Sequence, residues 1–409
     1  MVTGIGVVAP NGIGAENFAT ACLEGRSGLS RIEGIDTSPL RSTVAAQVKD
    51  FDPLSVLDSV DARRVPRVVP LALAASKEAL ASAQLDIDPN DIETQRSIGV
   101  AFGTGGGGLA FVEDQYKAYF TEGKGSLLSI TAGTHGNLSS ELSILLHLRG
   151  PSHVLSTGCA SSTDAIAYAA MMIRAGTSPM MLCGGADAPV STGILLAFER
   201  MRVVTTRAWD DPAKASRPFS ADRDGFVLGE GAWMFVLEER KHALARGATV
   251  LAEVAGYGST CDAYHRVQIA PDILEPVRAI ELALQDAGLA KDDVGYVNLH
   301  GTSTELNDRM ETAALKKCFG DERARRIPMS STKSMIGHPQ GACGAAGIAA
   351  MILCMRRGAI HPTINLDEPD PTCDLDYVPH RARAARVDVA LCNCIAFGSK
   401  NSALILTRG

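Results

Sequence analysis

Residues 154–162 read Val-Leu-Ser-Thr-Gly-Cys-Ala-Ser-Ser, and an apolar, alanine-rich stretch continues from there to residue 174. The apolar run is typical of a short buried strand, and the alanine-rich stretch is typical of a helix. A similar unit recurs at residues 327–358, where Met-Ser-Ser-Thr-Lys at 329–333 precedes a glycine- and alanine-rich segment. Alanine-rich helices resemble one another by chance as well, but the shared order favours an internal duplication whose halves meet near residue 250.

Short apolar runs alternate with helical patterns along the whole chain, which predicts an α/β fold with buried sheets. Several of these runs end at a glycine or another small residue directly before a helix, an arrangement that presents side chains at the end of a sheet. We therefore expect the functional residues at these ends, in the cleft between the two halves. The runs span residues 97–102, 180–183, 233–237, 294–299 and 403–406.

The composition excludes several classes of protein. With 409 residues, 46% hydrophobic and 21% charged, the chain is neither disordered nor a coiled coil. A net charge of −7 gives no overall attraction to nucleic acid or to an anionic membrane. Ten scattered cysteines without a CxxC pair, no leader sequence and no apolar run of about 18 residues predict a cytoplasmic protein without a zinc site.

Residues 103–108 read Gly-Thr-Gly-Gly-Gly-Gly and formally satisfy the GxGxxG pattern of dinucleotide-binding loops. A charged helical segment follows, however, and no second strand with an acidic end is evident. The stretch is thus more typical of a turn that permits close backbone approach. A nicotinamide-dependent oxidoreductase built on this loop is kept as an alternative.

Cys159 stands where the strand passes into the helix, and two histidines and a lysine follow strand-like runs in the second half: His300, Lys333 and His338. The unpaired N–H groups and the dipole of a helix N-terminus stabilise a thiolate, so we expect a lowered pKa for Cys159. The same N–H groups can hold an oxyanion, and imidazoles can stabilise an enolate. Each residue taken alone is more often structural, but the set favours acyl-transfer chemistry.

These residues resemble the catalytic motifs of the β-ketoacyl-acyl-carrier-protein synthases, condensing enzymes of the thiolase superfamily, over essentially the whole chain. The family's nucleophile falls on Cys159 in Thr-Gly-Cys-Ala-Ser, and its two histidines fall on His300 in His-Gly-Thr-Ser-Thr and on His338 in Ser-Thr-Lys-Ser-Met-Ile-Gly-His. Its lysine falls on Lys333 and its acidic residue on Glu311. The resemblance implies that Lys333 and Glu311 form an ion pair that orders the site.

The resemblance implies a thiolase fold, with five αβαβα layers and two duplicated halves that each hold a mixed five-stranded sheet. Residues 1–250 would carry the cysteine, and residues 251–409 would carry the histidines. It also implies that no metal or redox cofactor takes part, because the phosphopantetheine arm belongs to the acyl carrier protein.

In the implied reaction, Cys159 accepts an acyl group from a carrier protein, and the N–H groups of Cys159 and Phe397 form the oxyanion hole. Malonyl-carrier protein then loses carbon dioxide, and its enolate attacks the acyl group to lengthen the chain by two carbons. Thr302 and Thr304 match positions that hold the pantetheine arm. The resemblance would place the carrier protein at a basic cluster formed by Arg63, Arg64 and Arg67. The alternative is that these arginines form only a solvated helix face.

The chain departs from the family pattern in two places. The loop usually read as Gly-Phe-Gly-Gly-Thr-Asn appears as Ala-Phe-Gly-Ser-Lys-Asn at 396–401, which keeps the gating Phe397. A position that often carries a bulky aliphatic residue at the acyl pocket is Gly106, so we expect a pocket that is deeper or open toward a partner. Phe198 matches a pocket-lining phenylalanine.

Short motifs at 186–189, 202–207 and 307–312 look closest to the ketosynthase alpha subunits of bacterial type II polyketide systems. Those subunits pair with a chain-length factor that lacks the cysteine. The alternatives are a fatty-acid elongating homodimer, a non-catalytic partner subunit, which Cys159 argues against, and a biosynthetic thiolase, in which a second cysteine would be expected.

Overall fold

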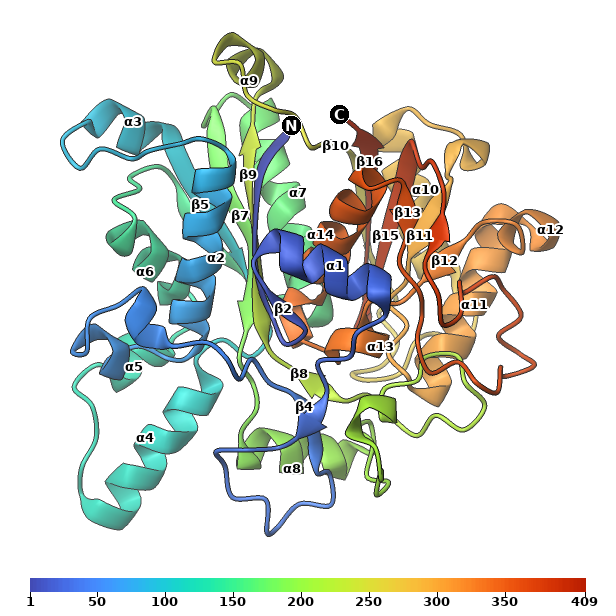
Figure 1. Cartoon of the computed structure of the whole chain (residues 1–409), viewed down its shortest axis with the longest axis horizontal. Helices are drawn as coiled ribbons and strands as arrows, with labels where there is room; N and C mark the ends of the chain where they lie inside the picture. The colour runs from blue at the N-terminus through green and yellow to red at the C-terminus, as the bar shows by residue number, and fades with distance from the viewer.

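A computed structural model describes all 409 residues and contains one continuous mixed sheet of eleven strands, which divides into two five-stranded sheets joined edge to edge, with the short β2 paired to β1 (Figure 1). The first has the order β1-β9-β7-β5-β6: Val2–Ala9, Gly231–Glu238, Met180–Asp187, Ile98–Gly103 and Ser152–Leu155. The second has the order β10-β16-β15-β11-β12: Ala252–Cys261, Lys400–Arg408, Val389–Ala396, Tyr296–Asn298 and Met329–Ser330. Pairing of Val2 with Ala252 joins β1 to β10, so hydrogen bonding continues from one sheet into the other.

The two sheets have the same topology. In the first, β9 is antiparallel to β1 and β7, and β5 is parallel to β7 and β6. In the second, β16 is antiparallel to β10 and β15, and β11 is parallel to β15 and β12. The repeated units recognised in the sequence occupy equivalent edge positions, which confirms the predicted duplication.

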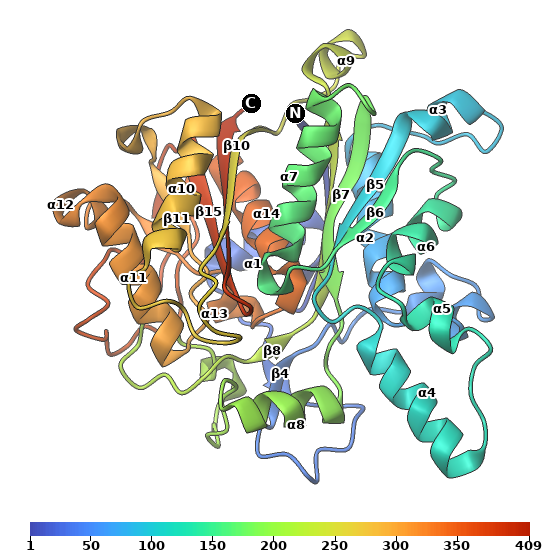
Figure 2. The ribbon, with the colours of Figure 1, turned by 180° about the vertical axis from the view of Figure 1, so that it is seen from behind.

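The helices form three layers around the two sheets (Figures 1 and 2). Between the sheets lie α7 (Ser161–Arg174) and α14 (Cys343–Arg356), with α1 (Ala15–Glu24) packed on α14. The outer layers are α2 (Val68–Ser82) and α6 (Asn137–Leu145) on one side, and α10 (Leu274–Ala287) and α11 (Glu305–Phe319) on the other. This αβαβα arrangement is the predicted one.

Glycine pairs bring the outer helices unusually close to the sheets at the same place in each half. A Cβ on Gly4 or Gly6 of β1 would lie only 2.1 or 1.9 Å from the carbonyl oxygen of Ala79 or Ala75 in α2. In the second half, Gly256 and Gly258 of β10 face α10 in the same way, with 2.2 and 2.0 Å to its carbonyl oxygens. Since any side chain would collide with helix backbone, both strands need glycine there.

The remaining elements are short or peripheral, apart from α4, which projects from the first half (Figure 2). None of the helices combines the length and the apolar character needed to cross a lipid bilayer. The helices are α3 (Ile92–Ser97), α4 (Leu109–Glu122), α5 (Ser129–Gly133), α8 (Thr192–Met201), α9 (Arg240–Ala245), α12 (Asp321–Ala324) and α13 (Lys333–Ile336). The strands are β2 (Gly12–Ile13), β3 (Ser30–Arg31), β4 (Val44–Ala46), β8 (Leu228–Gly229), β13 (Ala359–Ile360) and β14 (Arg383–Ala384).

Candidate active site

Cys159 lies in the turn that joins edge strand β6 to the central helix α7. One turn of 3-10 helix, Gly158–Ala160, separates the two elements. Gly158 has a φ of 67°, a left-handed conformation that favours glycine, and a Cβ there would lie 3.4 Å from the carbonyl oxygen of Phe397. The turn therefore directs the Cys159 side chain toward the second half of the molecule.

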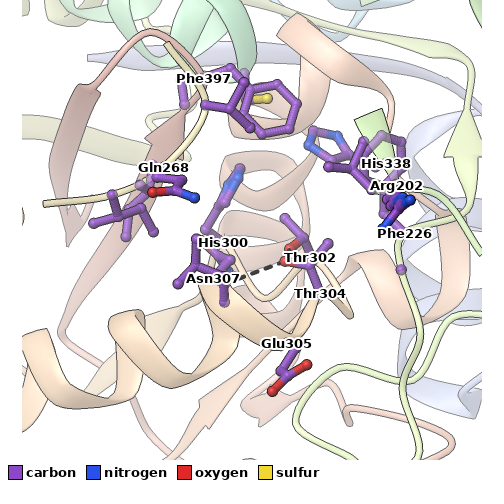
Figure 3. Close-up of a pocket in the computed structure, with 18 of the residues that line it drawn as sticks. Arg202, Phe226, Gln268, His300, Thr302, Thr304, Glu305, Asn307, His338 and Phe397 are labelled. Atoms are coloured by element: carbon purple, nitrogen blue, oxygen red, sulfur yellow. Dashed lines mark hydrogen bonds between the residues drawn. The ribbon is translucent and has the colours of Figure 1, made fainter. Parts of the chain in front are cut away.

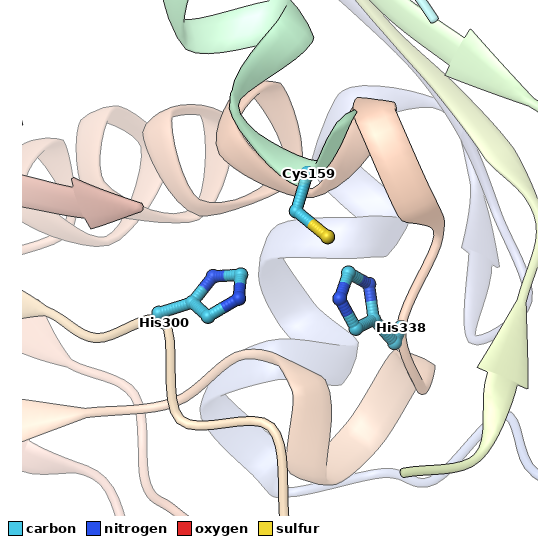
Figure 4. Close-up of side chains that lie close together, drawn as sticks. All are labelled: Cys159, His300 and His338. Carbon is cyan, nitrogen blue, oxygen red and sulfur yellow. The ribbon is translucent and has the colours of Figure 1, made fainter. Parts of the chain in front are cut away.

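His300 and His338 come from the second half and converge on the Cys159 thiol (Figure 4). The sulfur and one nitrogen of each imidazole all lie within 4.8 Å of one another. The two rings are almost perpendicular, with centroids 5.5 Å apart. His300 follows β11 and His338 follows α13, so the duplicated halves each contribute to one buried cluster.

Both imidazoles are held in the neutral state. Burial, followed by the charge of Lys333, lowers the pKa of His300 to about 4. Burial, followed by the charges of Lys333 and His300, also holds the pKa of His338 well below its usual range. A neutral imidazole has one nitrogen that donates and one that accepts, so near neutral pH each ring can both donate a hydrogen bond to a carbonyl and accept one.

The expectation of a lowered pKa for the Cys159 thiol is wrong for this structure. Burial raises the pKa of Cys159 to about 12, although the charge of Lys333 and the backbone N–H of Phe397 act in the opposite direction. Removing the sulfur from water destabilises the thiolate more than the short helical turn stabilises it. Cys159 is therefore a neutral thiol that needs a proton acceptor when it attacks.

We predict that the alkylation rate of Cys159 by iodoacetamide rises about tenfold per pH unit between about pH 6 and pH 9, without levelling off. The raised pKa of Cys159 leaves the thiolate fraction far from saturation over this range. Peptide-level mass spectrometry, with Cys159→Ala to assign the peptide, measures the rate. A plateau below pH 8 would show that the resting thiol is already ionised.

Lys333 and Glu311 do not form the predicted ion pair, and that prediction is corrected here. The Lys333 ammonium donates to the carbonyl oxygen of His300 at 2.6 Å. Glu311, on α11, accepts from the backbone N–H groups of His300 and Gly301, both at 2.7 Å, and from the side-chain amide of Asn393. The two residues thus fix the peptide of His300 from opposite sides.

A cavity of about 350 Å³ opens onto the cysteine and the two histidines (Figure 3). Thr302 and Thr304, which were matched to the pantetheine arm, line this cavity, and their hydroxyls are 2.8 Å apart. Phe397 also lines it, at the tight turn between β15 and β16. The thiol therefore lies at the end of a pocket with hydroxyl groups on its wall.

Three further residues of the cavity wall were not singled out from the sequence: Phe226, Gln268 and Asn307. The ring of Phe226 packs edge-on against that of His338, with centroids 5.1 Å apart. Asn307 belongs to the motif at 307–312 and was within reach of sequence reasoning. Gln268 belongs to a loop without a motif, so nothing in its sequence signals its position.

The glycine-rich loop after β5 does not offer a phosphate site. The carboxylate of Asp187, at the end of β7, accepts from the backbone N–H groups of Gly105, Gly106 and Gly107 at 2.8 to 3.1 Å. It also accepts from the Thr104 hydroxyl and the N–H of Gly341. Because a buried internal anion already occupies the N–H groups, the nicotinamide-dependent alternative is wrong.

Neither Gly106 nor Phe198, the two residues predicted at the acyl pocket, lines this cavity. A Cβ on Gly106 would lie 3.3 Å from an Asp187 oxygen, so its missing side chain leaves no deep hollow within this chain. Phe198 lies behind Phe226, with ring centroids 5.4 Å apart. In the altered loop, the Ser399 hydroxyl donates to the carbonyl oxygen of His265 at 2.7 Å, which anchors the turn that carries Phe397.

The predicted carrier-binding arginines differ in their surroundings. Arg63 and Arg64 are exposed. Arg67 directs its guanidinium inward, at 2.8 Å from the buried carboxylate of Glu230 and within hydrogen-bond distance of the Val48 carbonyl. All three arginines are exposed to solvent, but Arg64 lies 3.9 Å from Asp61 and Arg67 is paired with Glu230, and their contact with a carrier protein stays a prediction.

Comparison with known proteins matches both parts of the chain. Residues 1–243 match the model of the beta-ketoacyl synthase N-terminal domain, and residues 251–367 match the C-terminal domain. The chain is 41% identical to a 3-oxoacyl-[acyl-carrier-protein] synthase 2 of Synechocystis sp., over 100% of the chain and 97% of the relative. It is 40% identical to the tetracenomycin polyketide synthase ketoacyl synthase alpha subunit of Streptomyces glaucescens, over 100% and 96%. Among solved structures, the ishigamide ketosynthase/chain length factor superposes with a TM-score of 0.90 at 34% identity, over 100% and 98% of the two chains.

Proposed function

Because this chain belongs to the β-ketoacyl synthase family, we propose that it lengthens an acyl chain held on Cys159 by decarboxylative condensation with a malonyl group on an acyl carrier protein. The observation that carries this proposal is the cluster of one thiol and two neutral imidazoles within 4.8 Å. The cluster lies at the end of a hydroxyl-lined cavity that suits a pantetheine arm.

In the first half-reaction, the Cys159 sulfur attacks the thioester carbon of the acyl-carrier protein while its proton passes to a neutral imidazole. The carrier's thiolate leaves and takes up that proton. The N–H of Phe397 points toward the sulfur of Cys159, and we propose that it stabilises the oxyanion together with the N–H of Cys159. The product is a thioester between the acyl group and Cys159.

In the second half-reaction, the bond between the carboxylate carbon and the α-carbon of the malonyl thioester breaks and carbon dioxide leaves. The electron pair of that bond stays on the thioester, which becomes an enolate. His300 and His338 donate hydrogen bonds to the enolate oxygen as its charge develops, while Thr302 and Thr304 hold the arm. The enolate carbon then attacks the acyl thioester, and the Cys159 thiolate leaves and takes up one proton from solvent, which restores the neutral thiol. Lys333 and Glu311 act on His300 through its backbone and are positioning residues.

Product analysis tests the proposal directly. Purified protein with acyl- and malonyl-carrier protein should form a ketoacyl product two carbons longer, with one carbon dioxide released per condensation. Acetyl-coenzyme A alone, supplied as both donor and acceptor, should give no product. A product from acetyl-coenzyme A alone would instead establish a biosynthetic thiolase.

The acyl chain that the enzyme lengthens would be a polyketide, and its partner subunit would be a chain-length factor. The alternative is a homodimer that elongates fatty acids. Strand β6 is a free sheet edge, and α4 to α6 beside it expose large apolar side chains. Such an edge needs a covering partner. The exposed residues are Tyr116, Tyr119, Phe120, Leu127, Ile130 and Ile144. A stable homodimer active without a second gene product would favour the fatty-acid alternative.

The partner surface also bears on the acyl pocket. Gly107 and Gly108 pack against His135 and Gly133, next to α5 and α6, so the glycine run borders the β6 surface. We propose that a partner completes the acyl tunnel past Gly106, with Phe198 supporting Phe226 at its wall. Gly106→Ile should then shorten the products, and an unchanged length distribution would discard this placement.

Charge reversal of Arg63 and Arg64 to glutamate should raise the KM for acyl-carrier protein about tenfold with kcat unchanged, because exposed interface charges act mainly on association. The carrier is expected to be acidic, as the basic cluster would attract it. Arg240→Glu, on the distant helix α9, is the matched control and should leave KM unchanged. Equal effects of the two reversals would exclude this docking site.

A further inference from the structure

A second cluster of thiol and imidazole groups lies behind the nucleophile, on the side away from the cavity. The sulfurs of Cys343 and Cys394 and one nitrogen of His300 all lie within 4.8 Å of one another. Both cysteines are buried, at 4% and 1% exposure, and neither lines the cavity. Cys343 begins the central helix α14 and Cys394 lies on β15, so rigid elements hold both sulfurs.

We propose that Cys343, Cys394 and His300 bind a thiophilic divalent cation such as Zn²⁺, and that the bound ion inhibits condensation by taking the His300 ring. Two thiolates and one imidazole are a donor set that such ions prefer. Because a Zn–S bond is about 2.3 Å long, two sulfurs on one tetrahedral ion lie about 3.8 Å apart. The observed spacing therefore needs shifts of less than about 1 Å.

The charge balance permits a cation at this depth. Each sulfur binds the ion as a thiolate, and any proton that the sulfur still carries passes to solvent. Two thiolates balance the two positive charges of the ion, so the nearby ammonium of Lys333 meets no net positive charge from the bound cluster.

The present contacts of the two thiols are ones that an ion can replace. The Cys343 thiol donates to the carbonyl oxygen of Cys159 at 3.1 Å, and the Thr163 hydroxyl donates to the sulfur of Cys394 at 3.4 Å. The second bond is made to sulfur as acceptor and suits a thiolate. His300 forms the wall shared with the cavity, which gives the ion a route from solvent.

Binding of Cd²⁺ alone, followed by the ultraviolet charge-transfer absorbance of the Cd–thiolate bond, tests the site without an activity assay. The full chain carries Cys159→Ala, which removes the nucleophile, and Cys261→Ser, which removes the exposed cysteine. This chain should bind one ion with two thiolates. Cys343→Ala or Cys394→Ala added to it should weaken binding at least about 100-fold.

Cys354→Ala is the matched control, because Cys354 is also buried and lies on the same helix as Cys343, near its opposite end. It should leave binding unchanged. Cys343→Ser and Cys394→Ser provide hydrogen-bonding variants if an alanine variant does not fold. No charge-transfer band from the folded parent, or a band that survives loss of both Cys343 and Cys394, would overturn the proposal.

The inhibition rests on the proposed function, whereas the binding does not. Zn²⁺ should inhibit elongation, and the chain with Cys343→Ala and Cys394→Ala should require at least about tenfold more Zn²⁺ for the same inhibition. Equal sensitivity of the two chains would place the inhibitory ion at Cys159, His300 and His338 instead. A chain that binds Cd²⁺ but forms no product would leave the metal site standing and count against the condensing reaction.

Discussion

Replacing His338 or His300 with alanine is expected to slow chain elongation by about 10²- to 10³-fold for each variant, the usual cost of removing one oxyanion donor. Both rings lie beside the Cys159 thiol, next to the proposed position of the enolate oxygen, and burial lowers the pKa of both, which keeps them neutral. The double variant should lose less than the product of the two factors, since the rings act on one oxygen. Single-turnover formation of ketoacyl product measures each rate.

His361→Gln is the matched control for both variants. His361 is fully buried and burial also lowers its pKa to about 4, but it contacts Tyr296, Asn298 and Thr332 and does not line the cavity. Elongation per folded molecule should be unchanged in this variant. If elongation by His338→Ala and His300→Ala fell no further than that of the control, enolate stabilisation by the two imidazoles would be wrong.

Asp187→Asn is expected to lower the free energy of unfolding by about 2–6 kcal/mol, although the two side chains have nearly the same shape. One Asp187 oxygen accepts from the N–H groups of Gly105 and Gly341, and the other from two further N–H groups and a hydroxyl. An asparagine amide turns an NH₂ group toward at least two of these buried donors. Each unpaired buried donor costs about 1–3 kcal/mol.

Denaturant unfolding of the native chain and the variant measures this difference. Asp210→Asn, at an exposed aspartate, removes one charge without removing a buried acceptor and should change stability by less than about 0.5 kcal/mol. A change of similar size in both variants would mean that the glycine-rich loop does not depend on the Asp187 carboxylate.

The positions of the main chemical groups were predictable because each stands at a strand end next to a small residue. Cys159 and His300 follow β6 and β11, and the repeat of strand order in the two halves brings such ends together. The periodicity of the chain predicted an α/β fold with buried sheets, and the resemblance to the condensing enzymes implied the αβαβα layers. Local patterns were sufficient here because the features concerned lie within a few residues of one another.

The charge partners were not predictable, since they depend on contacts between residues far apart in the chain. Glu311 turns to the peptide of His300 rather than to Lys333, and Arg67 turns to Glu230, 163 residues away. The predicted shift in the pKa of Cys159 had the wrong direction, because the argument from the helix N-terminus does not include the cost of burying the thiolate. Asp187 supplies the anion of the glycine-rich loop from another strand, which no local motif reveals.

The most direct test of the condensing reaction is intact-protein mass spectrometry of the native chain and Cys159→Ala after incubation with acyl-carrier protein, followed by malonyl-carrier protein. We predict an acyl adduct on the native chain alone, and its disappearance as a ketoacyl product two carbons longer forms. To include loading that requires a partner subunit, the chain is also co-expressed with a chain-length factor. An adduct on Cys159→Ala would contradict the assignment of Cys159 as the residue that holds the acyl group. The absence of an adduct on the folded native chain, both alone and with a chain-length factor, would contradict it as well.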